Sequence, residues 1–438
     1  MNKPASQNDS ITDSVGLKRS LGVLSATLMG VGVILGAGIY VIIGVAAGWA
    51  GNAVWLSFLI AAVAAALAGI SYARLGRLRP KNAPEYQYLN MAFGQIPGFL
   101  AGWMVLWATV ISTSAVALGF AGYLEHLFGI PIAIGSIGLI IFASIVVFIG
   151  IGESVVMAGI LTAIEVLGLV IIIAIGAPHL GDVNILEMPL GVTGVITAAS
   201  LVFFAYIGFE GMANLSEEMK NPERDLPKAI IYALGISTLL YILVGIAAVS
   251  VVGWSELSQS SAPLAIVAAE VLGTNANVLL TAIALASTAN TVIILMVSAS
   301  RAMWAMACSG VLPKALCVLG KQRRTPWATI LVVGIVTTIF AVIGNLQTVA
   351  EFTNVVILLA FTGVHASLIK IFGIGEYHKN NIRNVLLNFI LPGSGMIIAL
   401  FLVASAGWQA ALFCGILLVI GVITHLIFQV SARGKQKS

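Results

Sequence analysis

Charged residues are scarce in this chain. Only 9% of its 438 residues are Asp, Glu, Lys or Arg, whereas 60% are hydrophobic and the mean hydropathy is +1.07. Soluble domains carry roughly 25% charged residues, so this chain cannot cover a water-facing surface with them. The composition therefore predicts an integral membrane protein. The formal net charge of +4 does not indicate nucleic-acid binding, because the cations lie between hydrophobic runs.

Cysteine is also rare, and the motifs of two protein classes are absent from the sequence. Cys308, Cys317 and Cys414 show neither metal-ligand nor redox spacing, so we expect three reduced, unpaired thiols, no metal site and no cofactor. There is no His-Glu-x-x-His motif and no Gly-x-x-x-x-Gly-Lys-Ser/Thr loop. These absences disfavour a membrane metalloprotease and a nucleotide-driven pump. We predict no catalytic residues and a protein that is not an enzyme.

Long apolar runs dominate the sequence instead. A helix of about 20 residues spans the hydrocarbon core of a bilayer. The polar stretch 1–20 lacks a signal-peptide core followed by a cleavage site, so we expect the first apolar run to stay as a membrane helix. Twelve runs are predicted to span the membrane, at residues 21–47, 52–75, 96–127, 129–150, 154–177, 194–215, 229–252, 276–305, 326–344, 348–372, 385–406 and 409–430.

The positions of the positive charges predict the orientation. If the twelve runs cross the membrane one after another and both termini lie inside, all 21 Lys and Arg residues lie on the inner side. Cytoplasmic loops carry an excess of Lys and Arg in membrane proteins. We therefore predict a multi-pass protein of the cytoplasmic (cell) membrane, with cytoplasmic tails at residues 1–20 and 431–438.

Glycine interrupts two of the apolar runs near their middles. The first run contains Gly36-Ala37-Gly38 and the second contains Gly208. Lipid offers no hydrogen-bond partners, so a broken helix at bilayer depth is tolerated only within protein or beside a polar cavity. Gly32 and Gly36 alone could instead form a small-residue packing face between helices. The second broken run, in the corresponding place, favours a transporter's substrate site.

The two breaks also divide the chain into similar halves. Each break interrupts the first span of a five-span block, at residues 21–177 and 194–372. Because five is odd, the second block enters the membrane from the opposite side and forms an inverted repeat with the first. Residues 385–430 supply two peripheral helices. The predicted fold class is an all-α integral membrane protein with twelve transmembrane helices.

The residues at the breaks suggest how a ligand is held. Glycine lets the chain leave helical geometry and lets a ligand approach the backbone. The half-helix that follows the first break presents free N–H groups and the positive end of its dipole, which suit a carboxylate. At the second break, Phe204 could close over a ligand or simply pack in the core. We favour the gate for Phe204 because it immediately precedes the break, and we leave Tyr206 undecided.

Glu165 is the only carboxylate in the middle of an otherwise apolar span. Placing a charge there costs roughly 2.5–3.5 kcal/mol or more, which makes the residue a functional candidate. It could bind and release a proton during transport. Two other interpretations stay open. The carboxyl could be permanently neutral and bonded to a neighbouring helix, or it could be a sodium ligand with Ser287 and Thr288 as partners.

Four other titratable residues lie in or near apolar runs. Glu210 follows the second break, and we expect it to cap exposed N–H groups or to bridge to a neighbouring helix. Glu351 lies near the end of a run and is expected at the interface. The isolated His365 and His425 are expected to be packing residues.

Several motifs, in this order and spacing, resemble the amino acid–polyamine–organocation (APC) superfamily of transporters, and within it bacterial relatives of the cationic amino acid transporters. The resemblance extends from about Leu17 to Pro326. The matching stretches are 32–40 (GVILGAGIY), 71–76 (SYARLG), 85–89 (EYQYL), 92–94 (AFG), 204–210 (FAYIGFE), 217–222 (EEMKNP) and 225–230 (DLPKAI).

The resemblance implies a LeuT-type fold of two inverted five-helix repeats. It implies that the first break binds the substrate's α-carboxylate, and that the second binds the α-amino group through backbone carbonyls and supplies the aromatic gate, Phe204. Many relatives carry a lysine in the fifth span that takes the place of a sodium ion. The motif ahead of Gly168 puts Glu165 there, so their coupling mechanism does not transfer unchanged. The implied substrate-binding residues are Ile34, Leu35, Gly36, Ala37, Gly38, Phe204, Ala205, Ile207 and Gly208.

Together these observations predict a secondary active transporter that moves an amino acid or related amine across the cytoplasmic membrane by alternating access. Proton coupling is expected through Glu165. The expected partners are the small-molecule substrate, H⁺ (or, as second choice, Na⁺) and the lipid bilayer, without nucleic acid. The alternatives are an amino acid exchanger without ion coupling, a sodium-coupled symporter, and a channel or receptor on the same scaffold. The sequence does not reveal which amino acid or amine is carried.

Overall fold

Helices account for the regular structure of this protein. The computed structural model describes residues 21–36, 38–76, 84–150, 155–212, 219–320, 323, 325–373 and 382–435. Within these ranges the chain forms helices and one isolated bridge between Leu21 and Met219. This agrees with the predicted all-α class. The expected N-terminal tail, residues 1–20, lies outside the described residues.

Each predicted run contains helix, and most of the helices are long. Ten helical segments of the described ranges are long and apolar enough to cross a membrane, and α1, α10 and α12 are shorter apolar helices. The number twelve and the inverted repeat of 21–177 and 194–372 stay predictions. The α-helices are α1 (Val23–Leu35), α2 (Gly38–Ala50), α3 (Val54–Leu75), α4 (Pro84–Phe93), α5 (Gln95–Phe128), α6 (Ile132–Ile149), α7 (Val155–Gly176), α8 (Gly191–Val202), α9 (Pro222–Gln259), α10 (Pro263–Leu272), α11 (Thr274–Cys308), α12 (Trp327–Ile343), α13 (Leu346–Leu368), α14 (Ile382–Val385), α15 (Leu391–Ser405) and α16 (Trp408–Lys435).

The helices differ from the predicted runs mainly at their ends. α4 and α10, which the sequence analysis did not place, each begin with a proline, the residue that suits the first position of a helix. α9 has 38 residues and is kinked at Gly253 (φ 71°, ψ 160°), which joins two helical parts. α11 has 35 residues, and both elements continue into polar sequence beyond the apolar run. α16 continues through Lys435, into the stretch expected to be a C-terminal tail.

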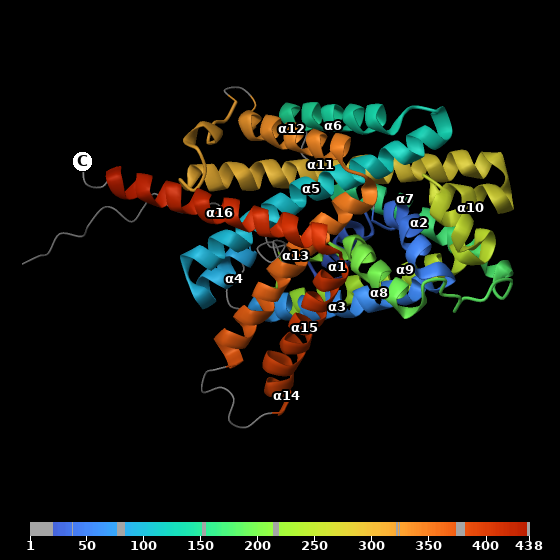
Figure 1. Ribbon diagram of the computed structural model, residues 1–438, viewed down its shortest axis with the longest axis horizontal. Coiled ribbons are helices and arrows are strands. Elements are labelled where there is room, and N and C mark those ends of the chain that lie inside the picture. The colour runs from blue at the N-terminus through green and yellow to red at the C-terminus, as the bar shows by residue number, and fades with distance from the viewer. Residues whose placement is uncertain are drawn as a thin grey trace, which may run out of the picture.

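α5 is the central helix. It packs against α4, α6, α11 and α13, and 78% of its most apolar stretch is buried. Figure 1 shows α5, α6, α11 and α12 extending along the long axis of the molecule, and these helices are in contact. Glycine permits the close approach of neighbouring helices to α5. A methyl group built on Gly119 would overlap the side chain of Val41, and one built on Gly122 would lie 2.6 Å from Ser261 O.

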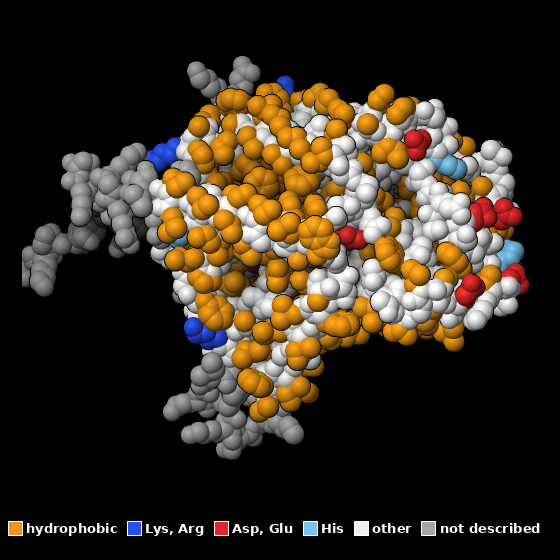
Figure 2. Space-filling view, in the orientation of Figure 1, with side chains coloured by type: hydrophobic (Ala, Val, Ile, Leu, Met, Phe, Trp, Pro, Cys, Tyr) orange, Lys and Arg blue, Asp and Glu red, His pale blue; other side chains and the backbone are white. Residues whose placement is uncertain are grey.

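The surface is apolar along its middle and polar at its ends. Large apolar side chains on many helices are exposed, among them Leu24, Ile343 and Ile397. In Figure 2, Lys and Arg side chains lie at the left end of the visible face, and most Asp and Glu side chains lie at the right end. An apolar belt between two polar ends is the surface that a lipid bilayer requires.

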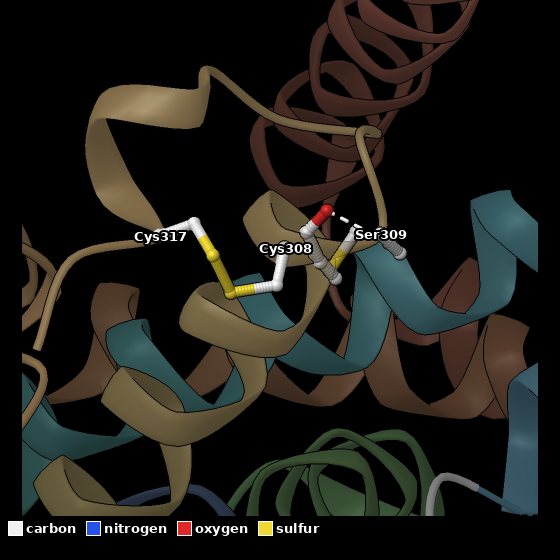
Figure 3. Close-up of a disulfide and its surroundings, with 4 residues drawn as sticks. Cys308, Ser309 and Cys317 are labelled. Carbon is white, nitrogen blue, oxygen red and sulfur yellow. Dashed lines mark hydrogen bonds between the residues drawn. A yellow bond between two sulfur atoms is a disulfide. The ribbon is translucent and has the colours of Figure 1, made fainter.

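Cys308 and Cys317 form a disulfide, which corrects the prediction of three unpaired thiols. Cys308 ends α11, the chain turns at Gly310 (φ 82°), and the 3-10 turn Lys314–Leu316 leads back to Cys317. The two Cα atoms are 4.9 Å apart. Figure 3 shows the bond joining the end of α11 to this returning segment. The pair was not predicted because its formation depends on a turn and not on a spacing motif. Cys414 is free, as predicted, and it is buried.

Candidate functional site

The first break separates α1 from α2. α1 ends at Leu35, and Gly36 has φ 19° and ψ −145°, far from helical values. The Gly36 N–H donates to Gly32 O at 3.2 Å and closes the last turn of α1. α2 begins at Gly38, and its first N–H groups have no partner within their own helix. Ala37, a predicted substrate residue, lies outside the described residues.

The second break is longer and begins earlier than the glycine that predicted it. α8 ends at Val202, and residues Phe203–Tyr206 form a 3-10 turn. Ile207 is extended, with φ −62° and ψ 135°, and Gly208 has φ 123°, which only glycine adopts without steric cost. The Gly208 N–H donates to Glu210 Oε2 at 2.8 Å. Glu210 therefore caps the end of the break, one of the two structural roles predicted for it.

The two breaks lie directly against each other. A methyl group built on Gly38 would lie 2.9 Å from Ala205 Cβ. One built on Gly208 would lie 2.9 Å from Val33 Cγ1 and 3.0 Å from Val33 O. Neither position has room for a side chain, because cores are packed to near crystal density. Glycine in each broken helix thus lets it touch the backbone or side chain of the other.

Tyr241 of α9 joins the two breaks. Its hydroxyl lies 2.7 Å from Ile34 O, in the last turn of α1, and 2.8 Å from Ala205 O, in the 3-10 turn. A hydroxyl has a single proton, so it donates fully to one carbonyl at a time. The sequence analysis missed this residue. A tyrosine inside an apolar run was the available signal, because a buried tyrosine hydroxyl needs an acceptor.

α11 contacts the first break from another side. Ser287 Oγ donates to Gly36 O at 3.2 Å. A methyl group built on Gly36 would lie 3.3 Å from Thr291 Oγ1, so Thr291 also lies beside the break. Thr288 Oγ1 instead donates to Ala284 O of its own helix at 2.6 Å. Of the two predicted ion ligands, Ser287 is hydrogen-bonded to the first break, whereas the Thr288 hydroxyl is hydrogen-bonded within α11.

Glu165 of α7 is 2% exposed and belongs to the same region. Its backbone carbonyl accepts the Tyr40 hydroxyl of α2 at 2.8 Å. Its side chain lies within electrostatic range of the hydroxyls of both Tyr40 and Tyr241. The backbone carbonyl of Tyr40 accepts in turn from Tyr123 of α5 at 2.9 Å. Glu165 therefore lies near the hydroxyl of Tyr241, which faces both breaks, and near that of Tyr40, a residue of the helix that follows the first break.

The carbonyl groups before the second break are held by α13. Asn354 Nδ2 donates to Ser200 O at 2.7 Å and to Leu201 O at 2.9 Å, and Asn354 is fully buried. These bonds satisfy carbonyls that α8 cannot satisfy where it ends. Phe204, the predicted gate, is buried in the turn that follows, and its carbonyl accepts the Ile207 N–H at 3.3 Å.

The other titratable candidates have local partners. Glu351 accepts from Gln347 at 2.7 Å, one turn away on α13. His365 and Ser71 share a hydrogen bond of 2.8 Å between α13 and α3. His425 stacks on the Phe99 ring with centroids 4.9 Å apart. Both histidines are buried packing residues, as predicted.

A separate cavity of about 510 Å³ lies beyond the first break. Its walls come from α2, α5, the start of α6, the segment Gln259–Pro263 and the junction of α12 with α13. Val41 of α2, one turn after Gly38, lines this cavity and contacts Gly119 of α5. In the part of the chain that the structure describes, no group of three or more His, Cys, Asp or Glu could hold a metal ion.

Comparison with known proteins gives the family. The family model described as amino acid permease matches residues 21–431. The branched-chain amino acid permease BcaP of Bacillus subtilis (strain 168) is 27% identical over 442 residues, which cover 94% of this chain and 93% of that protein. The methylthioribose transporter of the same organism is 31% identical over 389 residues, with 84% of each chain covered.

A human relative is similar over a shorter part of its own length. Cationic amino acid transporter 4 of Homo sapiens is 32% identical over 384 residues, which cover 82% of this chain and 60% of that protein. The names of these relatives describe transport and not catalysis. The ten helices of membrane-spanning length in the described residues agree with transport across a membrane. The chain therefore belongs to the amino acid permease family of the APC superfamily, and it is a multi-pass membrane transporter for amino acids and not an enzyme.

Proposed function

We propose that this permease is a secondary active transporter that moves an amino acid or related amine across the cytoplasmic membrane by alternating access, coupled to protons through Glu165. The observation that carries the proposal is the meeting of two broken helices, with Gly38 against Ala205 and Gly208 against Val33. Transporters bind their substrates where discontinuous helices meet near the bilayer midplane. On this proposal ten of the twelve membrane helices form a LeuT-type inverted repeat of five and five, and the last two are peripheral.

The first break provides the anionic half of the site. The N–H groups at the start of α2 and the positive end of its dipole point toward the break. A carboxylate is the substrate group that accepts from such amides. We assign the substrate carboxylate to residues Leu35–Gly38, with Ala37 included from the sequence alone.

The second break provides the cationic half. Ile34 O and Ala205 O both face the Tyr241 hydroxyl, which can donate fully to only one of them. The carbonyl to which Tyr241 does not donate can accept a hydrogen bond from a substrate ammonium group. The ammonium has three donors and can reach a carbonyl of each break, so the substrate would link the two broken helices.

Glu165 provides the proton site in this proposal. Glu165 is 2% exposed in a membrane span, where burial of a charged carboxylate is energetically unfavourable and burial of the neutral acid is much less so. Protonation in one conformation and release in the other would couple transport to the proton gradient. Tyr241 lies within electrostatic range of this carboxyl and faces a carbonyl of each break, so a change in the charge of Glu165 acts on both breaks.

The gate and the orientation complete the proposal. Phe204 is buried beside the second break and is assigned to close over the bound substrate. Lys and Arg gather at one end of the molecule, and this end is assigned to the cytoplasm together with both termini.

The test begins with finding a substrate. Purified protein is screened by thermal shift against the amino acids at two pH values, and the compounds that stabilise it are used for uptake into proteoliposomes. We expect saturable uptake, acceleration by substrate on the opposite side, and stimulation by an inward proton gradient. Flux that rises linearly with concentration and shows no counterflow would indicate a channel and contradict the proposal.

Sodium coupling and simple exchange are separated from proton coupling in the same vesicles. Gly36 O and Ser287 Oγ are the oxygens that a sodium ion would share, but here the hydroxyl donates its proton to that carbonyl. We expect uptake at fixed pH to be unchanged when sodium is replaced by choline. Strict sodium dependence would favour the symporter alternative, and counterflow with no effect of a proton gradient would favour the exchanger.

A further inference from the structure

The disulfide lies in the most basic segment at the end of α11. Arg301 precedes it, Lys314 lies inside the ring that it closes, and Arg323 follows it. Clustered positive charge marks the cytoplasmic side of a membrane protein. The cytosol keeps thiols reduced, and disulfides that form there are usually transient and redox-sensing or catalytic. A structural disulfide, formed once and kept, does not suit this location.

Neither cysteine of the pair is buried. Cys308 is exposed and Cys317 is half-buried, at the polar end of the molecule. Reaction of a cysteine with a soluble thiol or disulfide requires such access. Cys414, by contrast, is 1% exposed inside the bundle. The chain therefore contains an accessible pair and a protected third cysteine that serves as an internal control.

The ring closed by the disulfide contacts two helices. Its 3-10 turn, Lys314–Leu316, contacts α11 and α12. Leu312, also within the ring, is buried against the bundle. Opening of the ring therefore loosens the contact of this turn with α11 and α12.

We propose that Cys308 and Cys317 form a reversible redox site, that their disulfide fixes the inner end of α11 and slows transport, and that reduction releases it. α11 carries Ser287 and Thr291 against Gly36, so restraint of its end restrains one wall of the first break. The site itself stands on the cysteine pair and on the assignment of the basic end to the cytoplasm, and its effect on transport rests on the proposed function.

The chemistry is exchange with a soluble thiol–disulfide couple such as glutathione. One cysteine thiolate attacks the disulfide of oxidised glutathione, and one glutathione thiolate leaves. The second cysteine attacks the mixed disulfide and releases the second glutathione. Two protein thiols have then lost two electrons and two protons, and one molecule of oxidised glutathione has become two of reduced glutathione.

The first experiment measures the thiols without any transport assay. Full-length protein in inside-out vesicles is equilibrated with glutathione buffers from fully reduced to fully oxidised, alkylated, and analysed by mass spectrometry. We expect Cys308 and Cys317 to lose reactivity together at one buffer ratio, while Cys414 stays unlabelled throughout. In Cys308→Ser, Cys317 should remain free of an intramolecular disulfide at every ratio. Two cysteines that titrate independently, or that stay fully alkylated in oxidised glutathione, would overturn the redox site.

The second experiment measures how reduction of the disulfide changes the dynamics of the ring and the rate of transport. Hydrogen exchange of the segment 309–320 should speed up about tenfold on reduction, because the ring no longer restrains it. Substrate exchange in proteoliposomes should speed up about two- to threefold on reduction. The Cys308→Ser/Cys317→Ser variant should match the reduced protein under both conditions, and Cys414→Ser should behave as the wild type. Equal exchange rates in the two redox forms, in protein that transports, would overturn the regulation. Absence of transport in every form would instead count against the proposed function.

Discussion

The two helix breaks are built differently although they meet. The first is abrupt, because α1 ends at Leu35 and α2 resumes at Gly38. The second is drawn out through a 3-10 turn, an extended residue and Gly208. The carbonyls of the first break are bonded by side chains of α9 and α11, whereas the second break also uses Asn354 of α13 and its own Glu210.

This difference indicates a division of roles. The abrupt break preserves a complete helix start, which presents several N–H groups in one direction. The long break presents carbonyls and an aromatic residue, and its own bonds hold it in an irregular form. The Tyr241 hydroxyl faces a carbonyl of each break, Ile34 O and Ala205 O, and so belongs to both.

The largest effect is expected for Gly36→Val, which tests the first break. The added carbons would occupy space 3.3 Å from Thr291 Oγ1 and 3.5 Å from Val33 O, where the substrate carboxylate is placed. Substrate binding should be lost while membrane insertion is kept. Gly22→Val is the control, because a methyl group there meets nothing within 4 Å. Wild-type affinity in Gly36→Val would defeat the assignment.

Gly208→Ala tests the second break in the same way. Its φ of 123° strains any other residue, and the new methyl group would press on Val33. Backbone strain of this kind costs on the order of 1–3 kcal/mol, which corresponds to a weakening of binding by about 5–150-fold. Gly211→Ala, three residues away in open space, should bind as the wild type. Equal behaviour of the two variants in a binding assay contradicts the proposed contact.

Tyr241→Phe tests whether the hydroxyl of one residue stabilises both breaks. Removal of the hydroxyl leaves two buried carbonyls without this donor, at a cost of about 1–3 kcal/mol of stability. The melting temperature of the empty protein should fall further than in Ser287→Ala, which affects only the first break. Tyr232→Phe, an exposed position on the same helix, is the control. A similar loss in Tyr241→Phe and Tyr232→Phe would show that the two bonds contribute little.

Glu165→Gln tests the proposal that Glu165 couples transport to the proton gradient. The amide keeps the size of the side chain but cannot bind and release a proton in the physiological range. Uptake into proteoliposomes should persist and lose its dependence on pH. Glu351→Gln, a half-buried carboxyl bonded to Gln347, should keep the wild-type profile. An unchanged profile in Glu165→Gln would make Glu165 a structural residue.

The smallest effect is expected for Phe204→Ala. Loss of the ring should weaken closure over the substrate, so bound substrate should dissociate a few times faster, as for a loosened lid. Phe203→Ala removes a neighbouring buried ring that packs on Phe361, and separates loss of packing from loss of the gate. Exchange kinetics that are unaltered in Phe204→Ala would count against the gate.

The sequence predicted the helices and the breaks because both depend on local chemistry. Apolar runs of sufficient length must form helices in lipid, and glycine inside such a run marks where a helix can end. The helices α4 and α10 were not predicted, since their polar or short sequences give a weak periodic signal. Their initial prolines were the available markers.

The side chains that hold the breaks together could not be predicted from sequence alone. Tyr241 lies 207 residues from Ile34 and Asn354 lies 154 residues from Ser200 in the chain. Such bonds depend on how distant helices pack, and packing is not readable from one helix's pattern. The Cys308–Cys317 bond has the same origin at shorter range, because it depends on a turn at Gly310.

The most direct test of the central claim is a cryo-EM structure of the protein with a substrate found by the thermal-shift screen. The account predicts density for an amino acid between the breaks, with its carboxylate at the first N–H groups of α2 and its ammonium at Ile34 O or Ala205 O. Well-resolved substrate density elsewhere, with the Gly38–Ala205 and Val33–Gly208 contacts unchanged, would contradict it.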